Sequence, residues 1–194
     1  MMKKKGFVLK ELENQMTHWG KTLLSFHLPR WEELPELDLY MDQVITLVDQ
    51  YLSPVIHSQK HTLLTPSMVN NYVKNGMIPS PKKKRYTRKH VAFLIAITLL
   101  KQVLTIAEVK QGILFQGKMI GIRNAYNLYC EMQEGAIHRV CMQAMGQEVK
   151  EMTEVYEIQY LAAQSATKAF ANKLLAEKII ELQISYLEEG VKNE

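Results

Sequence analysis

The chain has 194 residues, of which 47% are apolar and 23% are charged, and its formal net charge is +4. This length is enough for one hydrophobic core or two modest ones. No apolar run approaches the roughly 20 residues that a membrane-spanning helix needs, which excludes a membrane protein. Two cysteines are too few for a disulfide framework, so Cys130 and Cys141 are expected to be reduced, buried thiols.

The first residues, MMKKK, have the charge of a signal peptide's start, but Lys10, Glu11 and Glu13 interrupt the apolar run that would have to follow. The protein is therefore expected to be cytoplasmic. A weak amphipathic pattern over residues 7–26 predicts a helix. After it, two prolines flank Trp31 and Leu34, which predicts an extended clasp whose tryptophan packs onto the domain.

Asp38 is the expected N-cap of a helix that ends before Pro54. The connection that follows, residues 53–64, is longer than the tight turn of a helix-turn-helix. Within it, His57 and His61 have the i, i+4 spacing that can share a metal ion on a helix. No third ligand is near them in the sequence, so a plain polar loop is favoured and no metal site is expected.

Residues 65–111 carry the strongest signals. Thr65 and Pro66 are typical of a helix start, and Gly76 is typical of a helix end, which predicts a short helix over residues 66–74. Residues 77–79 should be extended, and residues 80–86 are too polar and proline-rich for core or helix, which predicts a small basic wing. Two further helices should begin at Thr87 and Thr105, with apolar residues at 3.6-residue spacing.

Positive charge is concentrated in the same stretch. Residues 65–111 hold nine Lys and Arg against the single acid Glu108, a net charge of +8, so the rest of the chain sums to −4. Six of these cations lie within residues 82–89, at a helix N-terminus, where cations are unfavourable unless an external anion is bound. A polyanion such as double-stranded DNA is the expected partner. The alternative is a solvated basic loop.

The region after Gly117 has a different character. Residues 118–145 predict one or two helices with a break near Gly135. Residues 147–187 contain neither proline nor glycine, and one helix of that length would span roughly 60 Å, so it should bend, split or reach a partner. The apolar pattern is not a sustained heptad repeat. We expect the residues after 117 to form a homodimer. The alternative is that these helices fold back as a closed bundle on residues 118–145.

The order of elements in residues 65–111 resembles the DNA-binding domain of MerR-type transcription regulators. The matching stretches are MVNNY (68–72), KNGMIP (74–79), KRYT (84–87), IAITL (95–99) and LTIAEV (104–109). Where MerR proteins commonly carry an arginine before the tyrosine, this chain has Asn70 and Asn71.

A closer resemblance, over roughly residues 25–115, is to a bacterial family of domains of unknown function (DUF1836-like), mostly from Gram-positive organisms. It rests on LPRWEELP (28–35), DLYMDQV (38–44), NNYVK (70–74) and KKRY (83–86). Taken with the patterns along the chain, the expected fold is mostly all-α and has three parts. These are an N-terminal helix and clasp (1–37), a MerR-like winged helix-turn-helix (38–116) and a helical C-terminal region for dimerisation or effector sensing (117–194).

The expected function is that of a DNA-binding transcription regulator. Base readout is assigned to Ser67, Asn70, Asn71 and Lys74, phosphate contact to Lys82, Lys83, Lys84, Arg85, Arg88 and Lys89, and support of the wing to Tyr86. Asn71 has an alternative role in bracing the turn at Gly76. The alternative function is a helical protein–protein interaction module that no longer binds DNA. No nucleotide-binding, nucleophile or metalloprotease motif is present, so neither an enzyme nor a cofactor is expected.

Overall fold

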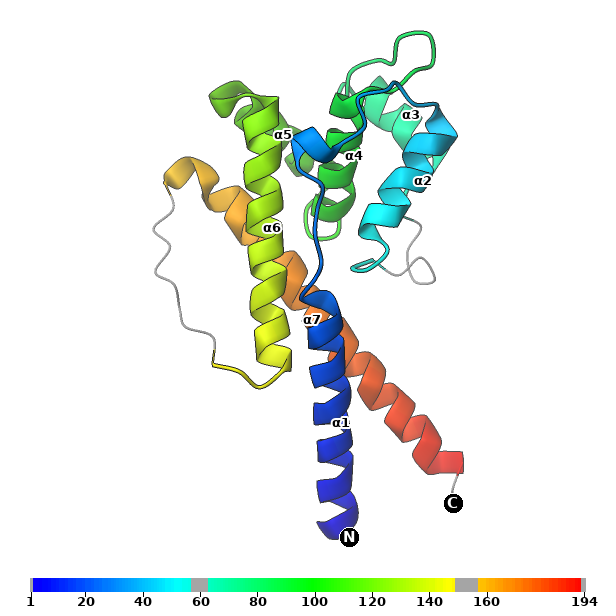
Figure 1. The fold of residues 1–194 in the computed structure, drawn as a ribbon, viewed down its shortest axis with the longest axis vertical. Coiled ribbons are helices and arrows are strands. Elements are labelled where there is room, and N and C mark those ends of the chain that lie inside the picture. Colours follow the sequence, from blue (N-terminus) through cyan, green and yellow to red (C-terminus); the bar gives the residue numbers. More distant parts are fainter. Residues whose placement is uncertain (1, 57–62, 149–156, 193–194) are drawn as a thin grey trace.

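The computed structural model describes residues 2–56, 63–148 and 157–192, and these residues form an all-α fold, as the sequence predicted (Figure 1). The elements are α1 (Met2–Leu23), η1 (Trp31–Glu33), α2 (Met41–Leu52), α3 (Pro66–Lys74), α4 (Arg88–Leu100), α5 (Ile106–Ile120), α6 (Ile122–Ala144), η2 (Ile158–Tyr160) and α7 (Leu161–Lys192). None of the described helices is both long and apolar enough to span a bilayer. The predicted His57–His61 pair lies outside the described residues.

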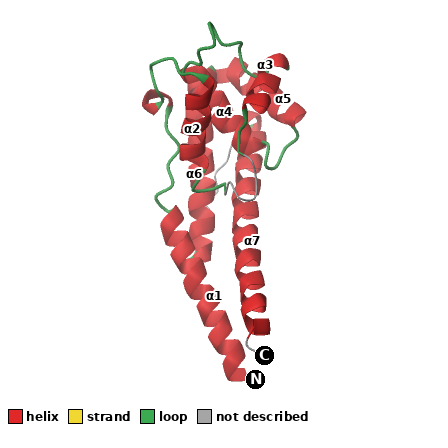
Figure 2. Cartoon of the chain, turned by 90° about the vertical axis from the view of Figure 1, so that its right-hand side faces the viewer, coloured by secondary structure: helices red, strands yellow, loops and turns green. Residues whose placement is uncertain are grey.

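Helix α6 is the centre of the arrangement, because α1, α4, α5, α7 and η1 all pack against it. The short helices α2 to α5 gather at one end of the molecule, and both chain termini lie at the opposite end, where α1 and α7 project (Figure 2). One continuous hydrophobic cluster includes side chains from every α-helix. The predicted division at residue 117 therefore falls within α5, and the residues on its two sides share a core.

Local signals fix the ends of α3 as predicted. The Thr65 hydroxyl accepts a hydrogen bond from the Met68 N–H at 3.2 Å, and Pro66 occupies the first turn. At the other end Gly76 takes a left-handed φ of 64°, and the Met77 N–H donates to the Tyr72 carbonyl at 2.9 Å. This is a Schellman motif, which needs a residue that tolerates positive φ at that position.

The start of α2 differs from the prediction. Asp38 is not its N-cap, because the helix begins at Met41, and the backbone N–H of Tyr40 is satisfied by the side chain of Gln43 at 2.9 Å. Instead, Leu39 forms an antiparallel β-bridge with Tyr86, with two backbone hydrogen bonds of 2.8 Å. The chain is thus held extended for two residues longer than the sequence indicated.

The predicted clasp is present and binds to α6, but it is not extended throughout, because Trp31–Glu33 form the 3-10 helix η1. We use this name for residues 27–34. The Tyr126 hydroxyl donates to the Pro29 carbonyl at 2.8 Å, and the Trp31 N–H donates to Asn127 Oδ1 at 2.8 Å. The Trp31 ring meets the Tyr126 ring edge-on, with 6.5 Å between centroids.

An ion pair anchors the same segment. The Glu134 carboxylate accepts two hydrogen bonds from the Arg30 guanidinium, at 2.7 and 2.5 Å, and one from the Leu28 N–H at 2.6 Å. Burial acts to raise the pKa of Glu134, but these donors outweigh it and hold the pKa below its ordinary value. The clasp is therefore held by charge-assisted bonds as well as by packing.

Helices α1 and α6 approach closely at Gly20. A β-carbon at this position would lie 2.8 Å from the Cys141 carbonyl oxygen, which is backbone and cannot move aside cheaply. Because Gly20 has no side chain, α1 can lie directly against α6 here. Cys130 and Cys141 are buried free thiols, as predicted, and burial raises their pKa values to about 12 and about 11.

The predicted break near Gly135 is wrong, because α6 runs unbroken through it. The break lies at Gly121, whose φ of 80° separates α5 from α6. A glycine inside a helix costs stability but does not end the helix unless the chain must turn there. The first half of α7 packs on α6, with Phe170, Ala171 and Leu174 buried, so this part of the chain has the closed packing that was the alternative to a dimer.

Candidate nucleic-acid interface

The outward face of α3 carries the four residues that were assigned to base readout. Val69 and Tyr72 are buried, so the helix can turn only its other side to solvent. Ser67, Asn70, Asn71 and Lys74 are all exposed on that side. The Asn70 amide hydrogen-bonds to no described residue, and this leaves both its donor and its acceptor available to a ligand.

Asn71 has a structural partner. Its Oδ1 accepts a hydrogen bond from the Asn75 amide at 3.1 Å, next to the turn at Gly76. The Asn75 carbonyl in turn accepts from Lys110 Nζ at 2.6 Å, which joins α5 to the end of α3. The alternative role of Asn71, bracing this turn, is the one that its contacts support.

Residues 82–85, which follow α3 in the sequence, form a tight turn that we name the basic turn. Lys82 and Arg85 form an antiparallel bridge, and the Arg85 N–H donates to the Lys82 carbonyl at 2.9 Å. The two central residues, Lys83 and Lys84, have φ values of 50° and 60°. Turns of this kind normally use Asn-Gly, because a side chain in the left-handed region costs roughly 1–2 kcal/mol.

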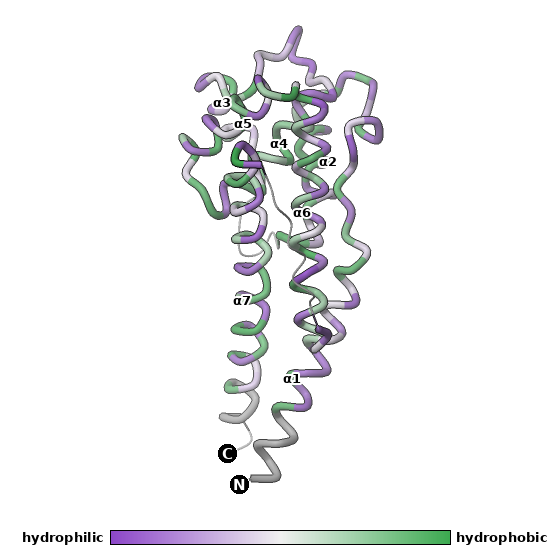
Figure 3. The backbone as a smooth tube through the Cα atoms, turned by 90° about the vertical axis from the view of Figure 1, so that its left-hand side faces the viewer, coloured by the Kyte–Doolittle hydropathy of each residue, from purple (hydrophilic) through white to green (hydrophobic). Residues whose placement is uncertain are grey.

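The basic turn projects from the molecule. Lys82, Lys83 and Lys84 are all exposed. Figure 3 shows many hydrophilic residues at the end of the molecule that holds α3, opposite the termini. Three neighbouring lysines therefore lie in solvent at the end of the molecule that holds α3.

Two of the predicted phosphate contacts are engaged within the protein. The Arg85 guanidinium stacks on the Tyr40 ring, 3.6 Å from its centroid. Arg88 Nε donates to the Leu34 carbonyl at 3.1 Å, and its Nη2 pairs with Glu36 at 3.1 Å. Both arginines hold residues 34–40 against the basic turn and α4, and this is a positioning role that the sequence did not indicate.

Other cations of residues 65–111 are also used internally. Lys101 Nζ donates to the Leu63 carbonyl at 2.8 Å, and burial lowers its pKa. Lys110 is bound at the end of α3, as described above. Of the nine cations, Arg85, Arg88, Lys101 and Lys110 thus have internal partners. Lys89 Nζ lies over the Phe93 ring, 5.9 Å from its centroid. The remaining four cations, 9 − 5, are Lys74, Lys82, Lys83 and Lys84.

Tyr86 and His90 form the base of the turn. Tyr86 is buried, and its ring meets the His90 ring edge-on at 5.3 Å. His90 Nε2 donates to the Pro79 carbonyl at 3.2 Å, so Nδ1 is the acceptor of the Thr87 N–H at 2.9 Å. Burial lowers the pKa of His90, with Lys89 acting in the same direction. A neutral histidine thus ties both ends of residues 79–87 together.

The described residues suit the binding of an extended anion and contain no metal centre. No group of three or more His, Cys, Asp or Glu side chains comes close enough to hold a metal ion in the described ranges. Sequence reasoning missed the roles of Tyr40, His90 and Lys110. Only His90 had a local signal, since it stands three residues after the N-cap Thr87, where a side chain can accept from the cap N–H.

The fold and this surface define an all-α protein in which a short exposed helix is followed by a projecting basic turn. A family model described as "Domain of unknown function (DUF1836)" matches residues 29–129, so the chain belongs to this family. The match covers most of the clasp, α2 to α5 and the first third of α6. Comparison with curated proteins and with solved structures gave no match.

Proposed function

We propose that the protein is a DNA-binding transcription regulator in which α3 lies in the major groove and the basic turn contacts phosphates, as in a MerR-like winged helix-turn-helix. The observation that carries this proposal is the exposed run of Lys82, Lys83 and Lys84 on a turn with two left-handed lysines. The like charges repel one another, and the backbone conformation is unfavourable for lysine. Neither feature helps the chain to fold, and both suit a site that meets a polyanion.

The outward face of α3 supports base readout. Asn70 and Lys74 are exposed one helical turn apart, where side chains lie on the same face. An asparagine amide can make two hydrogen bonds to adenine in the major groove, and lysine can donate to guanine. The Schellman motif and the Lys110 contact fix the end of α3 next to these residues.

Phosphate contact is tested with Lys83→Ala and Lys84→Ala combined. Binding to every duplex should weaken, and the slope of log K against log salt should become shallower by roughly 0.9 for each lost contact. The matched control is Lys10→Ala with Lys21→Ala, which removes two exposed lysines from α1. Fluorescence anisotropy over a salt series measures the affinity and the salt slope of both double variants. An unchanged slope in the double variant contradicts the proposal.

Base readout is tested with Asn70→Ala. The discrimination at one base pair should fall by about 1–3 kcal/mol, while binding to unrelated duplexes stays the same. Selection from a random DNA library, before and after the change, measures this. Asn71→Ala is the control, because its side chain is bonded to Asn75. Retrieval of an acidic protein partner after nuclease treatment, with no sequence preference in DNA, would favour the interaction-module alternative.

We further propose that the protein is a homodimer through α7. Ile180, Ile184 and Leu187 are 53, 50 and 65% exposed and follow the i, i+4, i+7 spacing of one helical stripe. They lie beyond the part of α7 that is buried against α6, toward the end of the molecule away from α3 (Figure 2). A symmetric pair would present two DNA-binding ends to a palindromic site.

Light scattering tests this pairing. Ile184→Asp should convert a dimer to a monomer, because it places a charge in the centre of the stripe. Ser185→Asp is the matched control, since this neighbouring residue is exposed and turned about 100° away around the helix. A monomeric wild-type protein at tens of micromolar would contradict the dimer.

A further inference from the structure

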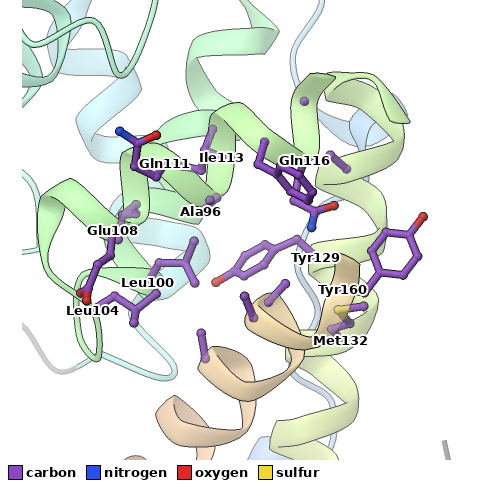
Figure 4. A pocket seen from close by; sticks show the side chains of 18 of the residues that line it. Ala96, Leu100, Leu104, Glu108, Gln111, Ile113, Gln116, Tyr129, Met132 and Tyr160 are labelled. Carbon is purple, nitrogen blue, oxygen red and sulfur yellow. The ribbon is translucent and has the colours of Figure 1, made fainter. Parts of the chain in front are cut away.

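A large cavity lies between α4, α5, α6, η2 and the first turns of α7, and its volume is about 1010 Å³ (Figure 4). Protein interiors are close-packed and leave few voids larger than a water molecule. Pockets that hold drug-sized ligands have volumes of about 300–1,000 Å³ and mainly apolar walls. Phe115 and Ile158, which line it, are 49 and 83% exposed, so the cavity opens to solvent on one side, and it has the size of a ligand site.

Small residues on four helices keep this space open. Ala96 faces it from α4, Gly112 and Gly117 from α5, Ala125 from α6, and Ala163 and Ala166 from α7. A β-carbon on Gly112 would meet nothing within 4 Å, and neither glycine has a left-handed φ. A helical glycine without a backbone reason lowers the stability of its helix. Gly112 is exposed and Gly117 is half-buried, so the two glycines leave room along the open wall of the cavity.

The walls offer little to a charged molecule. Of the described residues that line the cavity, only Glu108 carries a charge, and its carboxylate accepts hydrogen bonds from the N–H and hydroxyl of Thr105 at the start of α5. An ion placed among the remaining walls would lose its hydration without gaining a counter-charge. A matching ligand is therefore uncharged.

Among the polar side chains of the walls, Tyr129 reaches furthest across the cavity (Figure 4). Tyr129 is 7% exposed, and its side chain extends from α6 across the space toward Ala96 and Leu100 (Figure 4). Its hydroxyl donates to Gln133 Oε1 at 3.3 Å, so the hydroxyl oxygen still has a lone pair to accept a hydrogen bond. Burial raises the pKa of Tyr129, which keeps the phenol neutral.

We propose that this cavity binds an uncharged, mainly apolar small molecule with one hydrogen-bond donor, which the Tyr129 hydroxyl accepts. Gln116 Nε2 donates to the Gln159 carbonyl at 2.6 Å and so joins α5 to the segment before α7 beside the bound molecule. Ligand contact with α4, α5, α6 and α7 at once would fix the positions of these helices relative to one another.

Helix α5, which lines the cavity, also contacts α3. Lys110 of α5 donates to the Asn75 carbonyl at the end of α3, and Gly112 lies two residues further along α5. A ligand that shifts α5 therefore changes the support of the exposed face of α3. Regulation of DNA binding by the ligand rests on the proposed function, whereas ligand binding itself does not.

Binding is tested on the full chain with N-phenyl-1-naphthylamine, an uncharged aromatic amine with one N–H donor that fluoresces in apolar surroundings. The wild-type protein should bind it saturably. Ala96→Phe and Gly112→Phe should each weaken binding at least tenfold, because the new ring occupies the cavity. Gly135→Phe is the matched control, since it also replaces a helical glycine with open space around it, on an exposed part of α6 outside the cavity.

Tyr129→Phe tests the hydrogen bond. This variant should weaken binding of the amine roughly 2- to 10-fold, while displacement by 1-phenylnaphthalene, which has no donor, stays the same. Circular dichroism establishes that each variant is folded. The proposal is overturned if the fluorescence does not saturate, or if Ala96→Phe and Gly112→Phe bind the amine as well as the wild type does.

A second copy of the chain is the competing occupant. In that case Ala96→Phe or Gly112→Phe would lower the mass seen by light scattering, which overturns a ligand site. Saturating probe should change the affinity of the protein for its selected DNA, and an unchanged affinity overturns the regulatory part. Probe binding by a protein that fails to bind any DNA would refute the proposed function and leave the ligand site standing.

Discussion

The clasp and the basic turn use charged residues in opposite ways. In the clasp, Arg30 and Glu134 have side chains that are only 25 and 21% exposed, and each satisfies the other. In the basic turn, Lys83 and Lys84 are exposed, and both have a positive φ, which is unfavourable for lysine. The first arrangement stabilises the fold. The second contributes nothing to the stability of the fold, and for this reason we propose that it serves a partner.

The largest effect should come from breaking the clasp. Glu134→Ala leaves Arg30 Nη2 and the Leu28 N–H without an acceptor and removes the counter-charge of Arg30, and it should lower the free energy of unfolding by about 3 kcal/mol. Urea denaturation measures this change. Glu32→Ala, which removes the exposed partner of Arg123, should have a much smaller effect. Similar losses in the two variants would show that the clasp pair is no more important than a surface pair.

Arg88 and Lys89 provide a sharper comparison, since they are neighbours with different contacts. Arg88→Ala removes the donor to the Leu34 carbonyl and should lower the free energy of unfolding by about 1–2 kcal/mol, with the salt slope of DNA binding unchanged. Lys89→Ala removes only a contact with the Phe93 ring at 5.9 Å, so it should change stability little and make the salt slope shallower by roughly 0.9. Denaturation and anisotropy on both proteins test this, and the reverse pattern would contradict the assignment.

Lys84→Gly should separate stability from binding at one residue. Glycine adopts the left-handed conformation without strain, so the free energy of unfolding should rise by about 1 kcal/mol. The salt slope of DNA binding should fall by roughly 0.9, because a charge is lost. Lys82→Gly is the control, since Lys82 lacks a positive φ and the change should not stabilise the protein. A less stable Lys84→Gly protein would argue against backbone strain.

The smallest effect concerns pH and His90. Its pKa in the folded protein is lowered by burial, so below the ordinary value of 6.5 the unfolded chain takes up a proton that the folded protein refuses. Stability should therefore fall as the pH falls, by at most about 0.7 kcal/mol between pH 7 and pH 6. His90→Gln keeps an acceptor for the Thr87 N–H and should remove this contribution. Urea denaturation at the two pH values compares the proteins.

The sequence predicted those elements whose ends are set by adjacent residues. Thr65, Pro66 and Gly76 determine α3 by local hydrogen bonds and a positive φ, and Thr105 begins α5 in the same way. Gly135 and Gly121 could not be told apart, since a glycine ends a helix only where the path of the chain requires a turn. The sequence therefore predicts helix ends that depend on neighbouring residues, but not those that depend on the path of the chain.

The roles of the cations depended on contacts between distant segments. Arg88 bonds to a carbonyl 54 positions earlier and Arg85 to one 47 positions earlier, so no local pattern separates them from Lys83 and Lys84. The cavity was also unpredictable, because its small residues come from four helices and are adjacent only after packing. Composition predicted a cationic surface, and only the fold shows which cations belong to it.

The clasp has a consequence for synthesis of the protein. Leu28 and Arg30 leave the ribosome more than 100 residues before Glu134, which is their shared acceptor. At about 5–20 residues per second, this segment waits roughly 5–20 s before α6 exists. During that time Leu28 and Leu34, both fully buried in the finished protein, are exposed to chaperones. Helix α1 has the same wait, since its packing surface is also on α6, so the nascent N-terminus stays unpacked until nearly three quarters of the chain is made.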